Sequence, residues 1–414
     1  MSKILFLTST YLPNPGANGL ITNILVEELQ RRGHNVSCIS VMREGEKNFE
    51  VINNIRIYRV TPSVYTQRTD WGKSNKYLNK AHRIIRNLKI STSILKYPNF
   101  DANQNKKIYK KIQEVFNKEH FDMVIAVCKP YANLEAISMF KRENKKVVTI
   151  AYYLDMIDSA QIPHFFPKKF LDRLSDRGNE RIFNNVDLVL LPESNEKINS
   201  SNQMIYNNEK IKYIGFPTFR NSSDKIENKS EIKDDVIRMT YAGTLDLNYR
   251  NPEMLFKHLL KSRRKIELNI FGANNCSELI KLYSRDNLLI INHGLVDHLK
   301  VMEYFNNSHV VINVSNKNLN AIPSKIFELF SIGKPIINLR FDINELTNSY
   351  FEKFPYVFHV NNDQENVDSL KYFLNDLQNY QINLTEVRRK FILNTPEYTV
   401  DQFERIIENF EKDI

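Results

Sequence analysis

The chain has 414 residues, which is long enough for two or three domains with sizeable cores. Hydrophobic residues make up 42% and charged residues 26%, which is typical of a soluble globular protein, and no apolar run approaches the roughly 18 residues of a membrane-spanning helix. The three cysteines (Cys38, Cys128 and Cys276) form no C-x-x-C pair, so we expect neither a disulfide framework nor a zinc site, and we expect a cytoplasmic location.

The net charge of +10 is concentrated in one segment. Residues 68–118 contain 13 Lys and Arg against 3 Asp and Glu, so 13 − 3 = +10, and the rest of the chain balances. Apolar and aromatic residues alternate with the basic ones in this segment. The pattern fits a pair of solvated helices or a peripheral contact with an anionic membrane surface. It fits nucleic acid least well, and we do not expect nucleic acid as a partner.

Strands and helices alternate along the first half of the chain. The apolar run after Met1 predicts a buried first strand rather than a signal peptide. A loop rich in Pro, Gly and Asn (residues 11–19) follows it, and the apolar stripe of residues 20–30 then predicts a helix. The expected strands are 3–8, 35–41, 122–127, 146–152 and 187–191, and further helices are expected in 73–118, 133–143 and 170–184.

A polar stretch separates this series from a second one. Further strands are expected at 238–242, 267–271, 288–292, 310–314 and 335–339, and an amphipathic helix at 399–411. Alternating strands and helices predict parallel sheets, so the expected class is α/β with two doubly wound Rossmann-like domains and a ligand cleft between them. The expected boundaries are 1–214 for the first domain, 215–235 for a linker, 236–396 for the second domain and 397–414 for the C-terminal helix.

The segment IPSKIFELFSIGKPIINL (residues 322–339) is the most informative one. Ser324 is expected to cap a short helix that ends at Gly333. The free amides of a helix start attract anions, and Lys325 would strengthen that attraction. Glu328 follows one turn later, about 5.4 Å along the axis, and a carboxylate there suits the vicinal hydroxyls of a ribose. The alternative is a capped helix whose Lys and Glu are merely solvated.

Other strand ends carry weaker signals. The segment YAGTLDLNYR predicts a strand that ends at Gly243, where the backbone could approach a ligand, and Arg250 could clamp a phosphate. An ordinary strand-to-helix turn with a surface Arg is the alternative. Glycines also follow the strands at Gly272 and Gly294, and His293 by itself is more often structural than catalytic. The loop 14–19 lacks the G-x-G-x-x-G dinucleotide fingerprint, so NAD binding is only weakly supported.

Together these segments resemble the GT-B glycosyltransferases, in particular the retaining glycosyltransferase family 4. The resemblance covers nearly the whole chain and is most specific in IPSKIFELFSIGKPI, with YAGTLDLNYRNP, the FG strand end and HGLV as weaker elements. It implies an N-terminal domain that binds acceptor, a C-terminal domain that binds a nucleotide sugar, and a last helix that crosses back to the N-terminal domain.

The same resemblance assigns expected roles to residues. Glu328 corresponds to the ribose-binding glutamate, Ser324 and Lys325 to diphosphate contacts, and Arg250 to the basic residue facing the leaving group. Two positions depart from the family pattern: Asn320 stands where a second glutamate is usual, and the stretch AYYLDMID keeps Asp155 but has Leu154 where His is common. Asp155 could contact the donor sugar or acceptor, or could simply cap a helix. The expected sites are catalytic Asp155, Arg250 and Lys325; donor-binding Gly243, Thr244, Gly272, His293, Gly294, Pro323, Ser324 and Glu328; and acceptor-binding Gly16, Asn18 and Gly19.

The implied function is transfer of a sugar, with retention, from a nucleoside-diphosphate sugar (most simply a UDP-sugar) to a glycan or lipid-linked acceptor in cell-surface polysaccharide or glycoconjugate synthesis. The sequence contains no D-x-D triplet, so we expect fixed cations rather than a metal at the diphosphate, and no cofactor beyond the nucleotide-sugar cosubstrate. Because of Asn320 and the missing His, a non-catalytic GT-B-like partner or glycan-binding protein is the alternative, followed by a nucleotide-sugar epimerase.

Overall fold

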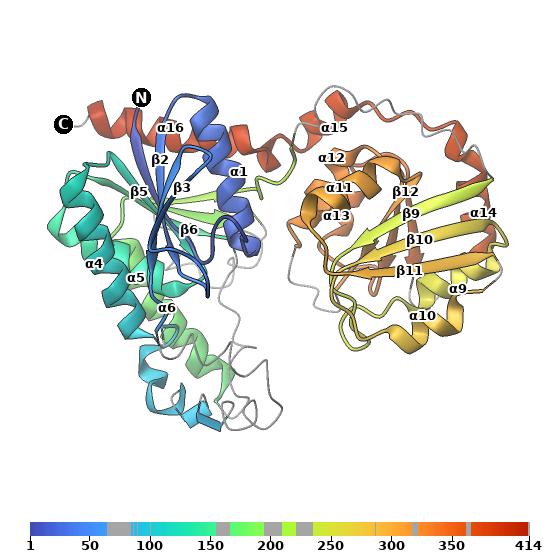
Figure 1. Ribbon diagram of the computed structural model, residues 1–414, viewed down its shortest axis with the longest axis horizontal. Coiled ribbons are helices and arrows are strands. Elements are labelled where there is room, and N and C mark those ends of the chain that lie inside the picture. Colours follow the sequence, from blue (N-terminus) through green and yellow to red (C-terminus); the bar gives the residue numbers. More distant parts are fainter. Residues whose placement is uncertain are drawn as a thin grey trace. The chain divides into compact units, whose positions relative to one another are not determined.

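The chain folds into two compact units, which the computed structural model describes over residues 1–63, 84–85, 87–88, 90–99, 101–154, 166–193, 209–220, 235–285, 287–316, 322–361 and 366–412. The first unit comprises Met1–Pro217 with Leu393–Ile414, and the second comprises Thr218–Ile392 (Figure 1). Each unit contains one largely parallel sheet with helices on both faces, so the expected class of two Rossmann-like α/β domains is confirmed. The cleft between them stays a prediction.

The first sheet has eight strands in the order β3-β4-β2-β1-β5-β6-β7-β8, and every neighbouring pair is parallel except β3 and β4. The central strands β5, β6 and β7 are buried along their whole length, as expected for parallel strands covered on both faces. The strands are β1 (Lys3–Leu7), β2 (Asn35–Val41), β3 (Phe49–Ile52), β4 (Ile55–Val60), β5 (Met123–Cys128), β6 (Val148–Tyr153), β7 (Leu188–Pro192) and β8 (Ile211–Ile214).

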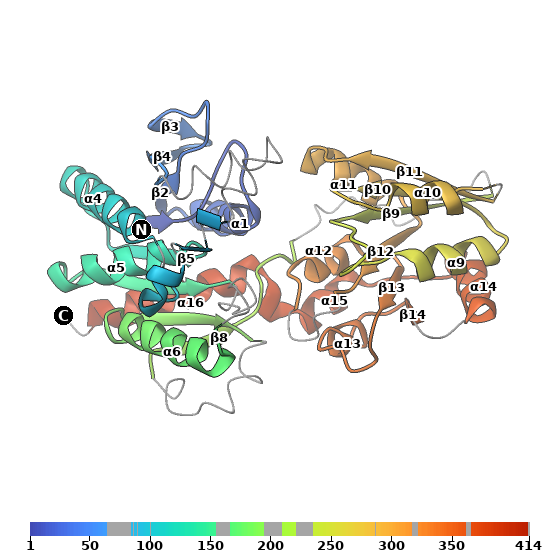
Figure 2. The same ribbon diagram turned by 90° about the horizontal axis from the view of Figure 1, so that it is seen from below.

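Helices cover both faces of the first sheet. The helices α1 and α16 lie together on one face, and α4 and α5 lie together on the other (Figure 1). The sequence analysis did not foresee β3 and β4, which form a hairpin at the edge of this sheet beside β2 (Figure 2). The helices are α1 (Ala17–Arg31), η1 (Ile94–Lys96), α4 (Ala102–Lys118), α5 (Tyr131–Glu143), α6 (Lys168–Asn184), η5 (Ile392–Asn394) and α16 (Pro396–Lys412).

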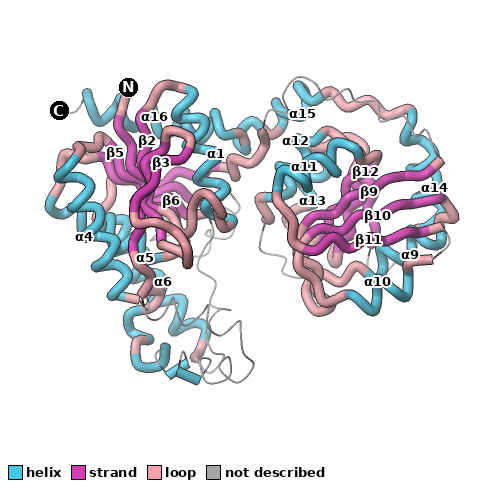
Figure 3. Tube along the Cα trace, viewed as in Figure 1, coloured by secondary structure: helices cyan, strands magenta, loops and turns pink. Residues whose placement is uncertain are grey.

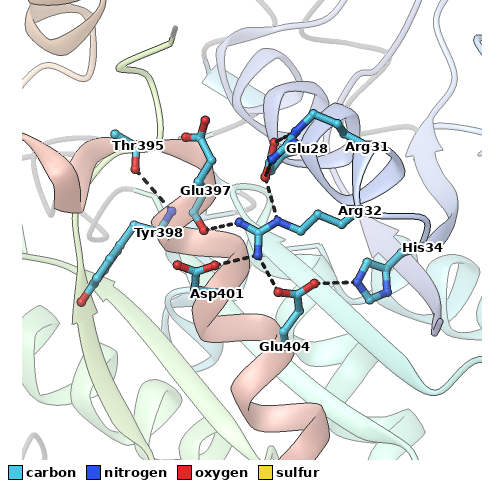
Figure 4. Close-up of polar contacts among 9 residues, drawn as sticks. All are labelled: Glu28, Arg31, Arg32, His34, Thr395, Glu397, Tyr398, Asp401 and Glu404. Atoms are coloured by element: carbon cyan, nitrogen blue, oxygen red, sulfur yellow. Dashed lines mark hydrogen bonds and ion pairs between the residues drawn. The ribbon is translucent and has the colours of Figure 1, made fainter. Parts of the chain in front are cut away.

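The C-terminal helix α16 belongs to the first unit although its sequence follows the second. Apolar packing attaches it, because the ring of Phe403 lies 6.4 Å from that of Phe6 and 6.3 Å from that of Tyr152. Ion pairs attach it as well: Arg32, next to the end of α1, contacts Asp401 at 2.6 Å and Glu404 at 2.5 Å (Figure 4).

The second sheet has six parallel strands in the order β11-β10-β9-β12-β13-β14. In each unit the strands form a single layer (Figure 3). Helices α9 and α10 cover one face of this sheet and α11 and α12 cover the other (Figure 1). The strands are β9 (Val236–Ala242), β10 (Lys265–Phe271), β11 (Leu288–Gly294), β12 (Val310–Val314), β13 (Ile336–Arg340) and β14 (Val357–Asn361). The helices are α9 (Glu253–Lys261), α10 (Ser277–Tyr283), α11 (His298–Asn307), α12 (Lys325–Ile332), α13 (Asn348–Phe351), α14 (Val367–Asn375), η4 (Asp376–Gln378) and α15 (Leu384–Lys390).

Candidate functional site

The order of strands in the second sheet predicts where a ligand would bind. From β9 the chain moves outward through β10 to β11 on one side, and it then returns to β12 on the other side of β9. In an open α/β sheet, ligands bind beside the carboxyl ends of the two strands where this direction reverses. The loop after β9 carries Gly243 and Arg250, and the chain after β12 leads into α12 with Lys325 and Glu328. Gly243, Arg250, Lys325 and Glu328 therefore all belong to segments that follow the two strands of the switch point.

Glycines allow the backbones at these strand ends to lie very close together. A Cβ on Gly272, which has a φ of +120°, would lie 2.3 Å from the carbonyl oxygen of Gly243. The amide of Gly272 donates to the carbonyl of Gly294 at 2.7 Å, so the three strand ends form one surface. A Cβ on Gly243 would lie 2.8 Å from the hydroxyl of Tyr241 and 3.0 Å from Nζ of Lys325. At Gly243 and Gly272, only glycine fits without displacing a neighbour.

Helix α12 begins where the sequence places it. Ser324 occupies the N-cap position, and Gly333 ends the helix with a φ of +68°. The side chain of Ser324 makes no capping hydrogen bond, which differs from the expected side-chain cap. Its backbone carbonyl instead accepts a hydrogen bond from the hydroxyl of Thr218 at 2.7 Å. Pro323 has no amide hydrogen to donate, so the amides of Ser324 and Lys325 are the first donors at this helix start.

Lys325 lies in an environment that weakens its hold on a proton. Its Nζ is 4.5 Å from the centre of the Tyr241 ring, a cation–π distance. Burial lowers the pKa of Lys325 to about 7, the carboxylate of Glu328 opposes this effect, and the charge of Arg250 adds to it. Burial also raises the pKa of Tyr241 to about 12, so its phenol stays neutral in this range. An anion bound beside Lys325 would return the proton to it.

Glu328 lies one turn into α12 and is paired with a histidine of α11. Its Oε1 is 2.8 Å from Nε2 of His298. Burial by itself would raise the pKa of Glu328, but the hydrogen bond and charge of His298, together with Lys325, hold it below its usual value. The carboxylate is therefore ionised at neutral pH and can accept hydrogen bonds from hydroxyl groups.

Arg250 lies near this site without belonging to a helix. Helix α9 begins only at Glu253, so Arg250 belongs to the preceding loop rather than to the helix start. Its Nε donates to Oδ1 of Asn316, in the chain between β12 and α12. The backbone amide and carbonyl of Arg250 both bond to Asp246, which fixes the loop. Thr244 is exposed in the same loop, and its carbonyl accepts from the Tyr241 hydroxyl at 3.0 Å.

His293 has the surroundings of a packing residue. Its ring stacks on Phe271 with centroids 4.4 Å apart, and its Nε2 lies 2.7 Å from Oδ1 of Asn269. Burial lowers the pKa of His293, so its ring is neutral at neutral pH. These contacts hold the end of β11 in place, and a direct role of His293 in donor binding stays a prediction.

The predicted acceptor loop lies at the corresponding position of the first sheet. The chain direction reverses between β1 and β5, and the loop after β1 leads to Gly16, the residue before α1. The Gly16 amide donates to Oγ1 of Thr10 at 3.0 Å, and a Cβ on Gly19 would lie 2.0 Å from the carbonyl oxygen of Thr10. Asn18 donates from Nδ2 to the carbonyl of Lys129, just after β5, at 3.2 Å. The loop is thereby fixed at the switch point, and its binding role stays a prediction.

Two predicted positions lie outside the described residues: Asp155, and Asn320 at the departure from the family pattern. Residues 68–83, 86, 89 and 100 of the basic segment and 221–234 of the expected linker lie outside them as well. The sequence analysis missed two charged residues near Glu328. These are His298, its hydrogen-bond partner, and Arg220, whose charge helps to lower the pKa of Glu328. Asp297, a typical cap before an apolar helix, signals α11 in the sequence, but the contact between α11 and α12 has no local signal.

The described part of the chain contains neither a metal-binding cluster nor a membrane-spanning helix. Within it, no group of three or more His, Cys, Asp or Glu residues is positioned to hold a metal ion. Among the described helices, none combines the length and the apolar character needed to cross a bilayer.

Comparison with known proteins bears on both units. Residues 250–402 match the family described as glycosyl transferase-like. The whole chain also superposes on solved structures. Sucrose-phosphate synthase from Thermosynechococcus elongatus has a TM-score of 0.64 at 13% identity, covering 100% of both chains. The Anabaena protein HepE, solved with UDP and glucose, has a TM-score of 0.59 at 11% identity, covering 99% of this chain and 100% of that one.

A glycosyltransferase from Rickettsia africae also matches, with a TM-score of 0.58 at 15% identity, covering 100% of this chain and 99% of that one. No curated protein sequence matches the chain. At these identities the structures establish the fold alone, which is GT-B, and the family match covers residues 250–402. The chain therefore has the GT-B fold, and its residues 250–402 are similar to the glycosyl transferase-like family.

Proposed function

We propose that the protein transfers a sugar, with retention, from a UDP-sugar to a glycan or lipid-linked acceptor in cell-surface polysaccharide or glycoconjugate synthesis. The observation that carries the proposal is the first turn of α12. Lys325 and the free amides of the helix start lie at one end of this turn, and the ionised carboxylate of Glu328 lies at the other. One turn rises about 5.4 Å, which suits a diphosphate at the helix start and ribose hydroxyls on the carboxylate.

The same residues supply a chemical role. When the bond between the sugar and the diphosphate breaks, negative charge builds up on the leaving phosphate oxygens. Amides at the start of α12, with Lys325 and Arg250, would stabilise that charge, and fixed cations of this kind need no reorganisation during the reaction. Because its pKa is about 7, Lys325 is only partly protonated at neutral pH and would take up a proton when the donor binds.

Two similar structures support the choice of donor. HepE was solved with UDP and glucose, and a trehalose-6-phosphate protein from E. coli was solved with UDP-2-fluoro glucose. The latter has a TM-score of 0.55 at 11% identity and covers 98% of that chain, so it supports the donor class only through a shared fold.

The basic segment supports an acceptor at an anionic lipid surface. Its described part carries apolar side chains that face solvent: Ile84 is 55% exposed, Leu88 62% and Leu95 77%. Exposed apolar side chains in a segment with a charge of +10 suit the interface of an anionic bilayer, where the apolar groups insert and the cations meet lipid head groups.

A donor screen tests the enzymatic proposal. The purified protein is incubated with UDP-, ADP- and GDP-sugars, and release of the nucleoside diphosphate is measured with and without acceptor extract. We expect acceptor-dependent release from one donor, and loss of at least about 100-fold in Glu328→Ala, a change of about 2.7 kcal/mol. Asn306→Ala is the control, because Asn306 is exposed on α11 and away from the site.

Each other outcome of the screen contradicts the proposal. Full transfer by Glu328→Ala would show that the Glu328 carboxylate is not needed for donor binding. Nucleotide binding without release would favour the non-catalytic partner, and conversion of the sugar without acceptor would favour an epimerase.

Vesicle sedimentation tests the lipid surface separately. We expect binding to vesicles that contain phosphatidylglycerol, weaker binding in high salt, and reduced binding of Leu88→Ser and Leu95→Ser. Leu289→Ser, at an exposed leucine of β11 in the second unit, is the control. Equal binding to purely zwitterionic vesicles would contradict the electrostatic part of the proposal.

A further inference from the structure

The carboxylate proposed to bind ribose is held by a side chain from another helix. His298 is the first residue of α11, and its Nε2 lies 2.8 Å from Oε1 of Glu328 in the first turn of α12. Among the described residues, this is the only hydrogen bond found to the Glu328 carboxylate. A glutamate has three side-chain dihedral angles, so a single charged hydrogen bond strongly restricts where its oxygens lie.

This hydrogen bond leaves room for a ligand. An ionised carboxylate has about four lone-pair positions on its two oxygens, and His298 uses one of them. Oε2 and the second lone pair of Oε1 remain available for two neighbouring hydroxyl groups. His298 therefore fixes the orientation of the carboxylate without blocking it.

The charges around His298 and Glu328 also stabilise the ionised carboxylate of Glu328 and its hydrogen bond to His298. Glu328 lies in the first turn of α12 and contacts the first residue of α11, so two positive helix ends act on its carboxylate. The hydrogen bond to Glu328 raises the pKa of His298, burial opposes this, and Arg220 and Asp297 act in opposite directions on it. Lys325 also faces the carboxylate from its own helix.

We propose that His298 is a positioning residue that holds the Glu328 carboxylate ready to accept the ribose hydroxyls of the nucleotide donor. The inference rests on the proposed function, because it assumes that a nucleoside diphosphate binds at α12. It goes beyond that proposal in assigning part of the recognition of the ribose to α11. Binding energy is gained because the carboxylate need not be ordered when the ligand arrives.

Two ligands and three variants test the inference. UDP and 2′,3′-dideoxy-UDP are titrated calorimetrically into the intact protein, His298→Ala, His298→Gln and the control Asn306→Ala, with ADP and GDP and their dideoxy forms used in the same way if UDP does not bind. We expect His298→Ala to weaken UDP binding about tenfold, or about 1.4 kcal/mol, and to leave dideoxy-UDP binding within about twofold.

His298→Gln separates hydrogen bonding from charge. The glutamine amide reaches about as far as Nε2 of histidine and donates a hydrogen bond without a charge, so we expect it to restore most of the lost UDP affinity. Asn306→Ala is expected to bind both ligands like the unaltered protein.

The possible failures are distinguishable. If the unaltered protein binds no nucleoside diphosphate, the proposed function fails and the inference fails with it. If the unaltered protein binds UDP but His298→Ala loses UDP and dideoxy-UDP equally, His298 has only a structural role and the inference alone is overturned. Unchanged UDP affinity in His298→Ala overturns it too. If His298→Ala does not fold, the ratio of UDP to dideoxy-UDP affinity in His298→Gln decides in the same way.

Discussion

Lys325 lies at the start of α12, where a cation could bind a diphosphate, and its pKa is close to 7. It lies beside the Tyr241 ring, and burial lowers its pKa to about 7, whereas an exposed lysine stays charged far above that value. Partial neutralisation reduces the cost of keeping a charge in this environment until a negatively charged ligand arrives. The residue thus links donor binding to proton uptake.

This link predicts a pH dependence with a definite sign. Because the ligand binds best to protonated Lys325, nucleotide affinity should fall as the pH rises above about 7, by up to about tenfold per pH unit. The loss of charge on His298, whose pKa is raised, acts in the same direction. Calorimetric titration of UDP between pH 6 and pH 8.5, in buffers with different heats of ionisation, measures both the affinity and the proton uptake.

Lys325→Gln is the control for the pH profile. It should bind UDP more weakly at pH 6 and show a flatter profile, since glutamine does not titrate. An unchanged slope in this variant would show that another group carries the pH dependence.

The glycines at the strand ends provide a second prediction for single residues. Gly272 and Gly294 both have positive φ, but only at Gly272 would a Cβ meet backbone, 2.3 Å from the carbonyl oxygen of Gly243, whereas nothing lies within 4 Å at Gly294. Gly294→Ala should therefore lose about 1 kcal/mol from backbone strain, and Gly272→Ala about 2 to 4 kcal/mol because displacement of Gly243 is added. Thermal unfolding of the two variants gives the comparison, and equal losses would argue against the close approach of these strands.

The sequence predicted those site residues whose positions depend only on neighbouring residues in the chain. Ser324, Lys325, Glu328 and Gly333 could be placed because helix capping and helical spacing are local properties. His298 could not be connected to Glu328, since 30 residues separate them and only tertiary packing brings α11 beside α12.

At the scale of elements, the contact of α16 with α1 depends more on Arg32 than on Arg31. Arg32, the residue after α1, contacts Glu28 of that helix and Asp401 and Glu404 of α16, and its side chain is only 19% exposed (Figure 4). Arg31 is 67% exposed, and among the described residues it forms an ion pair with Glu28 alone.

Replacing each arginine tests this difference. Arg32→Ala should lower the free energy of local opening of α16 by about 2 kcal/mol, because the hydrogen bonds it loses involve charged groups. Arg31→Ala should change it by less than about 0.5 kcal/mol, because its ion pair is exposed. Amide hydrogen exchange in α16 measures both effects, and equal protection in the two variants would contradict this account of the contact.

Most buried strands could be predicted because they are continuous apolar runs, and β2 was predicted at its observed bounds, Asn35–Val41. The edge strands β3 and β14 could not. In β3 the residues alternate between exposed and half-buried, and β14 is mostly half-buried, so neither gives a clear apolar pattern. Their strand structure depends on pairing with β4 and β13 rather than on their own sequence.

At the scale of the whole molecule, the chain leaves its first unit and later returns to it. Gly215, just before the departure, lies against Leu393, just after the return: a Cβ on Gly215 would be 2.4 Å from the Leu393 carbonyl oxygen. The last segment therefore completes the first unit, whereas the second unit is a continuous stretch of chain.

A truncation after Ile392 should destabilise the first unit and leave the second unit folded. Removing α16 exposes Phe6 and Tyr152, which pack against Phe403, so we expect the first unit to unfold or aggregate. The second unit keeps its own core and should still bind UDP. Proteolysis with and without UDP, followed by mass spectrometry, identifies the protected part. A first unit that resists proteolysis as well as in the full chain would contradict this division.

A structure of the protein with UDP bound tests the central claim most directly. The account predicts that the diphosphate lies at the start of α12, within hydrogen-bond distance of its first amides and of Lys325, and that both ribose hydroxyls bond to the carboxylate of Glu328. A nucleotide bound away from α12, or a ribose that does not touch Glu328, would contradict it.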